Sequence, residues 1–258
     1  GVIMITWPDN YYHTSGDRPE ICDPTQLHRA IVLAAVSAYT IAEAGEEGAA
    51  KIASEVASNA AKRMAIKMKY DLSLLNEATA ENFAQLYRSA RFNQDAMLKN
   101  ETATLATVME LAPASAALKE LVNTLQAGVK TTWTTNGKSI DAAMKIKASA
   151  LGVAPIKSIV LTAEEKAASK VYPRSTAKVK EYGYGVLRSV PAAVMAKYGF
   201  NKRGAVNHGG EIAKLTVGGT NSVLDIKKML DAQFPNPDSL ETITKYLEML
   251  KEAGLVEF

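Results

Sequence analysis

Tyr11-Tyr12-His13-Thr14-Ser15-Gly16-Asp17, with Asp23-Pro24-Thr25-Gln26-Leu27 shortly after it, is the stretch that most constrains the fold. It follows the run Val2-Ile3-Met4-Ile5-Thr6, which is apolar except for its last residue and is typical of a strand covered on both faces. A strand, a loop with one histidine and a capped helix form a common arrangement for directing an imidazole at a metal ion. The stretch therefore predicts that His13 is a metal ligand.

A helix is expected to begin at Pro24. Asp23 is a good N-cap, proline suits the first helical position, and Gln26 can complete a capping box. Gly45 offers a stop, so the helix should end near Ala44. Its residues at helical spacing predict one buried face, formed by Leu27, Ile31, Ala34, Ala35, Ala38 and Ile41.

One histidine is not enough for a catalytic zinc site, which has about three protein ligands. The other two histidines, His28 on the expected helix and His208 in an expected turn, are not at metal-binding spacing from His13 on one helix. The only Glu-Glu pairs, Glu46-Glu47 and Glu164-Glu165, lie in alanine-rich helical stretches and are interpreted as solvated charges. We therefore expect the remaining ligands to lie upstream of residue 1.

The run Trp7-Pro8-Asp9-Asn10-Tyr11-Tyr12-His13-Thr14-Ser15-Gly16-Asp17, together with Asp23-Pro24-Thr25-Gln26-Leu27, resembles the last motif of the two-zinc aminopeptidases. This is the family of aminopeptidase Y, aminopeptidase S and related carboxypeptidase-like enzymes. The resemblance covers roughly residues 2–45. It implies that His13 is the final zinc ligand, on the loop after a late strand of the central sheet. The alternative is a surface loop whose histidine caps or packs locally.

The same resemblance implies a peptidase of which this chain is the C-terminal portion. The family's other ligands, a His-x-Asp pair, a Glu-Glu pair and a further acid, come earlier in the chain and are not in this sequence. Asp17 would hold the loop or orient a neighbouring group, and Tyr12 would contact the peptide substrate or pack. The two zinc ions would bind and deprotonate the attacking water and polarise the peptide carbonyl. No catalytic residue is expected within these residues, so residues 1–258 alone should be inactive. The resemblance favours an extracytoplasmic location.

Length, cysteine content and net charge limit the classes of protein and of partner that fit this sequence. A length of 258 residues allows one to three units, and the single Cys22 excludes an internal disulfide framework. The net charge of +3 is too small to argue for a nucleic-acid partner. The longest apolar stretch, residues 30–44, is interrupted by polar residues and falls short of the ~20 apolar residues of a membrane span. We expect no nucleic-acid and no membrane partner.

The rest of the chain predicts a mainly α protein with a small α+β end. Residues 1–45 are assigned to the tail of the α/β catalytic domain. Residues 46–152 are alanine-rich and are expected to form a bundle, with later helices at about residues 80–99, 102–111 and 114–127. Residues 153–206 contain three prolines and many basic residues, and are interpreted as a basic connector with a solvated or acid-pairing surface; a nucleic-acid patch is the alternative.

In residues 207–258, a strand is expected at 211–217, helices at 223–234 and from about 239 to 253, and a short strand at 255–258. Asp238 or Ser239 is expected to cap the second of these helices and Gly254 to end it. The pattern of Ser222-Val223-Leu224-Asp225-Ile226 followed by residues 246–256 resembles a small winged-helix or PqqD-like module. Eight acidic residues against five lysines after residue 206 favour a protein partner over DNA. The alternative function is therefore a non-catalytic helical scaffold with a peptide-binding or dimerisation module, with a homo-oligomer as one possible assembly.

Overall fold

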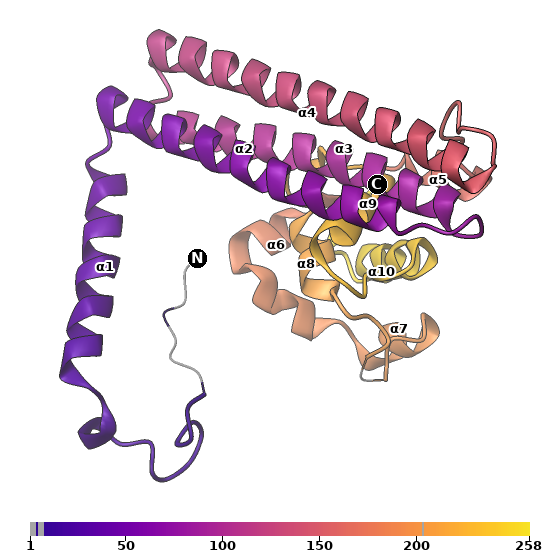
Figure 1. Ribbon diagram of the computed structural model, residues 1–258. Helices are drawn as coiled ribbons and strands as arrows, with labels where there is room; N and C mark the ends of the chain where they lie inside the picture. Colours follow the sequence, from indigo (N-terminus) through magenta and orange to yellow (C-terminus); the bar gives the residue numbers. More distant parts are fainter. Residues whose placement is uncertain (1–3, 5–7, 203) are drawn as a thin grey trace.

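The computed structural model describes residue 4, residues 8–202 and residues 204–258. Nearly all of the regular structure in these residues is helical, which confirms the expectation of a mainly α protein. Figure 1 shows three parts: helix α1 standing apart, three long helices α2, α3 and α4 side by side, and a group of short elements from α5 to α10 packed below them. The strand expected at residues 2–6 lies outside the described residues, apart from an exposed Met4.

Helix α1 (Pro24–Ala42) begins as its sequence predicts, but it ends early. Asp23 Oδ1 accepts hydrogen bonds from the backbone N–H groups of Thr25 (2.7 Å) and Gln26 (3.3 Å), with Pro24 at the first position. The reciprocal bond of a capping box is not formed. The helix ends at Ala42, and Gly45 is the N-cap of the next helix instead of the stop of this one.

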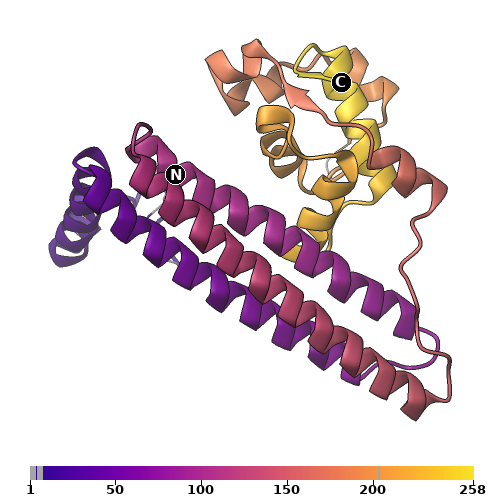
Figure 2. The same ribbon diagram turned by 90° about the horizontal axis from the view of Figure 1, so that it is seen from above.

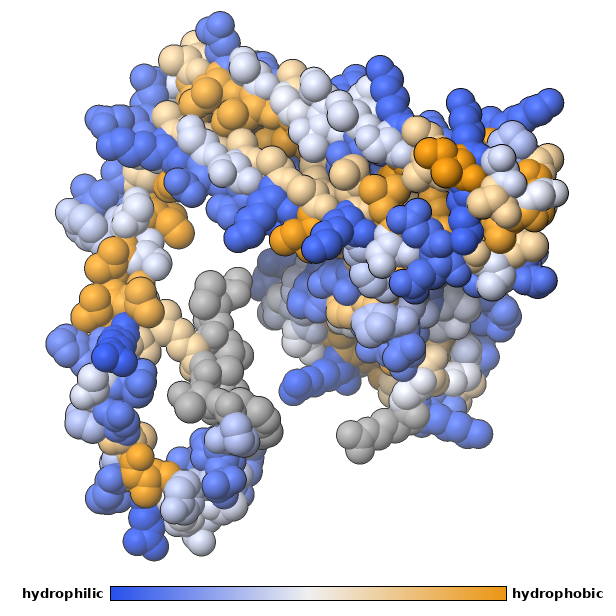
Figure 3. Space-filling view, in the orientation of Figure 1, coloured by the Kyte–Doolittle hydropathy of each residue, from blue (hydrophilic) through white to orange (hydrophobic). Residues whose placement is uncertain are grey.

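The predicted burial of one face of α1 is wrong for the described residues. None of its residues is buried, and Ile31 and Ile41 of the predicted face expose 57% and 59% of their surface. The reason is that no other described element packs extensively against this helix (Figure 1). The space-filling view shows the apolar side chains along its length (Figure 3).

The bundle consists of α2 (Glu46–Asn76), α3 (Phe83–Thr107), the 3-10 turn η2 (Val108–Leu111) and α4 (Ala116–Leu151). The sequence predicted more and shorter helices. Thr102, expected near a helix start, lies inside α3, where its Oγ1 donates to the Leu98 carbonyl at 2.7 Å. Gly128 likewise continues within α4, which runs to Leu151 and stops at Gly152 in the left-handed conformation (φ 66°).

Small and apolar side chains fill the interior of this bundle. Ala49, Ala60 and Met64 of α2 are fully buried, and Ile52 and Val56 are half-buried. On α3, Phe83, Tyr87 and Ala90 are buried, and Leu86 is half-buried. The repeated alanines allow the long helices to lie close along their whole length (Figure 2).

The remaining elements form one C-terminal unit around a shared core (Figure 2). Their bounds are α5 (Ala163–Ala168), β1 (Arg174–Ser175), α6 (Ala177–Tyr182), η3 (Tyr184–Ser189), α7 (Ala192–Lys197), α8 (Gly209–Lys214), η4 (Val217–Gly219), α9 (Val223–Gln233), α10 (Leu240–Glu252) and β2 (Val256–Glu257). Ile226 and Leu230 of α9 and Ile243, Leu247 and Leu250 of α10 are fully buried at its centre.

Two expectations for this unit are corrected. The interval 153–206 is no mere connector, because Ala168, Val179 and Val190 pack into the same core as α9 and α10. The strand expected at residues 211–217 is instead α8 followed by η4. The physical reason is the spacing of its inward side chains: Ile212, Ala213 and Thr216 are buried while Lys214 is exposed, which fits a helix face and not the alternation of a strand.

The expected end of the chain is confirmed. Helix α10 is capped by Ser239, whose Oγ accepts from the Thr242 N–H at 3.0 Å, and it ends at a left-handed Gly254 (φ 69°). Strand β2 follows and pairs antiparallel with β1, with Arg174 opposite Glu257 and Ser175 opposite Val256. Each strand has two residues.

No single helix of the described residues is long and apolar enough to cross a membrane. Only α1 and α2 taken together meet the length and composition test, and they are bent by 119° at their junction.

Candidate functional site

The His13 loop is a chain of tight turns held by its own polar groups. Asp9 Oδ1 accepts from the Tyr11 N–H at 2.9 Å. The Tyr11 carbonyl accepts from both the N–H (2.9 Å) and the hydroxyl (2.7 Å) of Thr14. These bonds span positions 9 to 14, so the backbone around His13 is fixed locally even though every side chain from Tyr11 to Ser15 is exposed.

His13 is the only non-glycine residue of the described chain with a positive φ, at 60°. This left-handed conformation is uncommon outside glycine, and such strained positions cluster at functional sites. The ring of Tyr12 meets the imidazole edge to face, with centroids 4.0 Å apart. The loop thus presents the imidazole at the surface in a defined backbone conformation, beside an aromatic ring.

Asp17 takes part in the loop through its backbone. Its N–H donates to the Thr14 carbonyl at 3.2 Å, while within the described residues its carboxylate makes no hydrogen bond or ion pair. Tyr12 and His13 are therefore brought together, and no bond joins Asp17 to the imidazole.

The donor set at this loop does not complete a metal site. No group of three His, Cys, Asp or Glu side chains arranged to hold a metal ion occurs among residue 4, 8–202 and 204–258. One imidazole supplies one ligand, whereas a catalytic zinc has about three from the protein. Cys22 is exposed.

The other two histidines lie elsewhere. His28 is exposed on α1. His208 immediately precedes α8, where its Nδ1 lies 3.0 Å from Asp238 Oδ2 and its ring stacks on Phe234 with centroids 4.0 Å apart. The same Asp238 carboxylate accepts from the backbone N–H groups of Asn207 and His208, both at 2.9 Å. This buried carboxylate fixes the entry to α8.

Glu165, one of the glutamates expected to be solvated charges, is half-buried and bonded to another helix. Glu165 pairs with the guanidinium of Arg88 on α3, and its carboxylate also accepts from the Thr162 N–H at 2.8 Å, which completes a capping box for α5. Burial alone would raise the pKa of Glu165, but these partners hold it below its ordinary value. Glu165 therefore fastens α5 to the bundle.

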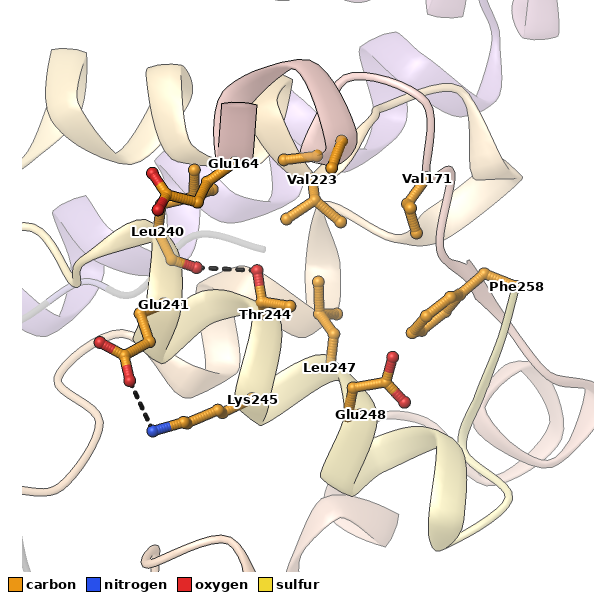
Figure 4. A pocket seen from close by; sticks show the side chains of 12 residues that line it. Glu164, Val171, Val223, Leu240, Glu241, Thr244, Lys245, Leu247, Glu248 and Phe258 are labelled. Atoms are coloured by element: carbon orange, nitrogen blue, oxygen red, sulfur yellow. Dashed lines mark hydrogen bonds and ion pairs between the residues drawn. The ribbon is translucent and has the colours of Figure 1, made fainter. Parts of the chain in front are cut away.

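A second candidate site is a groove of about 650 Å³ on the C-terminal unit, between α5 and α10. We call it the α5–α10 groove. Its apolar lining includes Val171, Val223, Leu247 and Phe258, and charged side chains stand at its edge (Figure 4). Its volume lies in the range of pockets that hold small ligands or peptide side chains.

Sequence reasoning missed this groove because its lining comes from four separate parts of the chain. One signal was available on α10. Leu240, Thr244 and Leu247 recur at intervals of four and three residues, so they share one helical face with the neighbouring Glu241 and Glu248. Because acidic side chains are rarely buried without a partner, this mixed face indicates a part of α10 that borders solvent.

Comparison of the chain with protein-family models, with curated proteins and with solved structures finds no match.

Proposed function

We propose that this chain is the C-terminal portion of a two-zinc aminopeptidase, in which His13 is one of the zinc ligands. The support lies in the motif around His13 and in its strained, locally fixed backbone. The peptide-bond hydrolysis of the intact enzyme would depend on ligands and a general base that these residues do not supply.

The observation that carries this proposal is the bare apolar surface of α1. An isolated helix with this many exposed aliphatic side chains is unfavourable in water, and large exposed apolar patches mark interaction sites. In the proposed enzyme, α1 follows the zinc-ligand loop and packs on the central sheet of the catalytic domain. In residues 1–258, both the zinc-ligand loop and α1 would then lack their partners because the rest of the proposed catalytic domain lies upstream.

The decisive experiment uses the natural product of the gene, purified from its host through a C-terminal tag. Mass spectrometry gives its N-terminus, metal analysis gives its zinc content, and aminoacyl-arylamide hydrolysis gives its activity. We expect an N-terminal extension, bound zinc and turnover, all absent from residues 1–258 expressed alone.

His13→Ala should lower the turnover of the natural protein by a factor of about 100 or more and its zinc content by about one of the two ions, because it removes a ligand of one ion. His28→Ala is the matched control, since His28 is an exposed histidine of the adjoining helix, and it should retain zinc. A natural protein that begins at residue 1, or zinc and activity unaffected by His13→Ala, would overturn the proposal.

A second candidate function is a helical scaffold with a peptide-binding module. The α5–α10 groove favours it, because its apolar lining and charged edge lie on the surface of the C-terminal unit. Binding of an extended peptide by residues 1–258 alone, which the peptidase proposal does not require, is its test.

A further inference from the structure

The charges around the α5–α10 groove are mostly negative. Glu164, Glu241 and Glu248 line it together with one cation, Lys245. The Lys245 ammonium is already engaged, at 2.6 Å from Glu241. Glu164 accepts a hydrogen bond from the Thr162 hydroxyl at 3.2 Å, and neither it nor Glu248 has an ion pair among the described residues. The groove therefore offers two carboxylates without a cationic partner.

Glu248 is placed where a charged and an apolar group of one ligand would be bound together. In Figure 4 its carboxylate and the ring of Phe258 both point into the groove, with Leu247 and Val171 nearby. The Lys251 ammonium lies 4.1 Å from the centroid of the Phe258 ring, so one contact of this ring is with a cation outside the groove lining. An aliphatic side chain inserted between Leu247 and Phe258 would bring a neighbouring cation towards Glu248.

Strand β2 lies beside the groove and leads into its lining. Val256 is 3% exposed and packs in the core of the C-terminal unit, so β2 offers no free backbone edge. Phe258 follows β2 directly and lines the groove. A segment bound in the groove would therefore meet this end of the chain through its side chains.

We propose that the α5–α10 groove binds an extended peptide segment that carries a large aliphatic side chain and, two positions away, a lysine or arginine. The spacing follows from strand geometry, in which alternate side chains share a face. The aliphatic side chain fills the groove between Leu247 and Phe258, and the cation meets Glu248. This inference rests on the second candidate function and is independent of the peptidase proposal.

The test measures fluorescence polarisation of labelled heptapeptides with the full chain. The probe is Gly-Lys-Ser-Leu-Ser-Lys-Gly, in which leucine and both lysines share one face of a strand. One comparison peptide replaces both lysines by glutamate, and a second replaces leucine by serine. We expect each replacement to weaken binding by a factor of ten or more.

Variants of the protein locate the binding. Glu248→Lys and Phe258→Ala should each weaken binding of the lysine peptide about tenfold, and Glu248→Lys should also reduce the preference for lysine over glutamate. Glu120→Lys, at an exposed glutamate of α4 far along the bundle, is the matched control and should bind as the unaltered protein does. Thermal unfolding of each variant checks that the fold is intact.

The outcomes separate the inference from the function on which it rests. If none of the peptides binds at millimolar concentration, both are wrong. If lysine and glutamate peptides bind equally well, or the serine peptide binds as well as the leucine peptide, peptide binding stands and the assigned specificity is overturned. Unchanged binding by both groove variants would place the peptide elsewhere and overturn the site.

Discussion

Lys99 of α3 and Asp225 of α9 form an ion pair that joins the bundle to the C-terminal unit. The Lys99 ammonium donates to Asp225 Oδ2 at 2.6 Å and to the Thr220 carbonyl at 2.8 Å. The same carboxylate oxygen accepts from the Ser222 N–H at 2.9 Å, and Ser222 Oγ accepts in turn from the Asp225 N–H at 3.1 Å, forming the capping box of α9. One carboxylate thus both begins a helix and docks it. Burial alone would raise the pKa of Asp225, but Lys99 and Ser222 hold it below its ordinary value.

Replacing this lysine should loosen the docking of the two units. Lys99→Met keeps the length of the side chain and removes the charge-assisted bonds to a half-buried carboxylate, so we expect a loss of about 1 kcal/mol in the free energy of unfolding at pH 7. Because the pKa of Asp225 is lowered in the folded state, this stabilisation is fully present above the unfolded pKa and is lost as pH falls through the lower, folded pKa. Urea unfolding at pH 7 and at a series of pH values from 4 down to 2.5 measures both effects.

Lys119→Met on α4 is the control for this prediction, because Lys119 is exposed and has no ion pair among the described residues. It should change the free energy of unfolding by less than about 0.5 kcal/mol at each of these pH values. An equal effect of both substitutions would show that the Lys99–Asp225 pair does not fasten the units.

Neighbouring positions of α2 should respond very differently to truncation. Met64 is fully buried between α3 and α4, whereas Ile66, two residues on, exposes 60% of its surface. Met64→Ala should lower the free energy of unfolding by about 2–5 kcal/mol, because it removes apolar contacts and leaves a cavity. Ile66→Ala should cost less than about 0.5 kcal/mol. Chemical denaturation of both variants compares them directly, and similar losses would contradict the orientation of α2 in the bundle.

Substitution of the exposed apolar side chains of α1 should affect stability differently in residues 1–258 and in the natural gene product. In residues 1–258, the double substitution Ile31→Gln and Leu33→Gln should leave the free energy of unfolding of the bundle within about 0.5 kcal/mol and reduce the fluorescence of a bound hydrophobic dye. In the natural gene product, the same change should lower the unfolding temperature, since α1 is there proposed to pack on a catalytic domain. No destabilisation of the natural protein would argue that α1 has no intramolecular partner.

The sequence predicted those elements whose signals are local. Asp23 and Pro24 marked the start of α1, Ser239 the start of α10 and Gly254 its end, because caps and stops are set by a few neighbouring residues. The continuous lengths of α3 and α4 were missed, since Thr102 bonds within its helix instead of starting one. The groove was missed because Val171, Leu247 and Phe258 meet only through tertiary packing.

A buried polar layer inside the bundle contains Asp71 of α2 and Asn93 of α3. Asp71 of α2 is 3% exposed; its Oδ1 accepts from Asn93 Nδ2 at 2.8 Å and lies 3.7 Å from the Lys67 ammonium, while its Oδ2 has no partner among the described residues. Burial raises the pKa of Asp71 to about 6, against the opposing effects of Lys67 and Asn93. A carboxyl whose pKa is higher in the folded than in the unfolded state binds its proton more tightly when folded. Its contribution to stability therefore increases as pH falls from above 6 towards 4.

Asp71→Asn keeps an acceptor for Asn93 and removes the titration. Between pH 7.5 and pH 5, the unaltered protein should gain about 1 kcal/mol of unfolding free energy relative to this variant, by linkage of a pKa raised from 3.8 to about 6. Urea unfolding at the two pH values measures the difference, in which contributions of other groups cancel. Glu55→Gln, at an exposed acid of the same helix, should follow the unaltered protein at both pH values. If Asp71→Asn does so as well, the carboxyl of Asp71 titrates alike in the folded and unfolded chain, and its burial among α2, α3 and α4 does not set its charge.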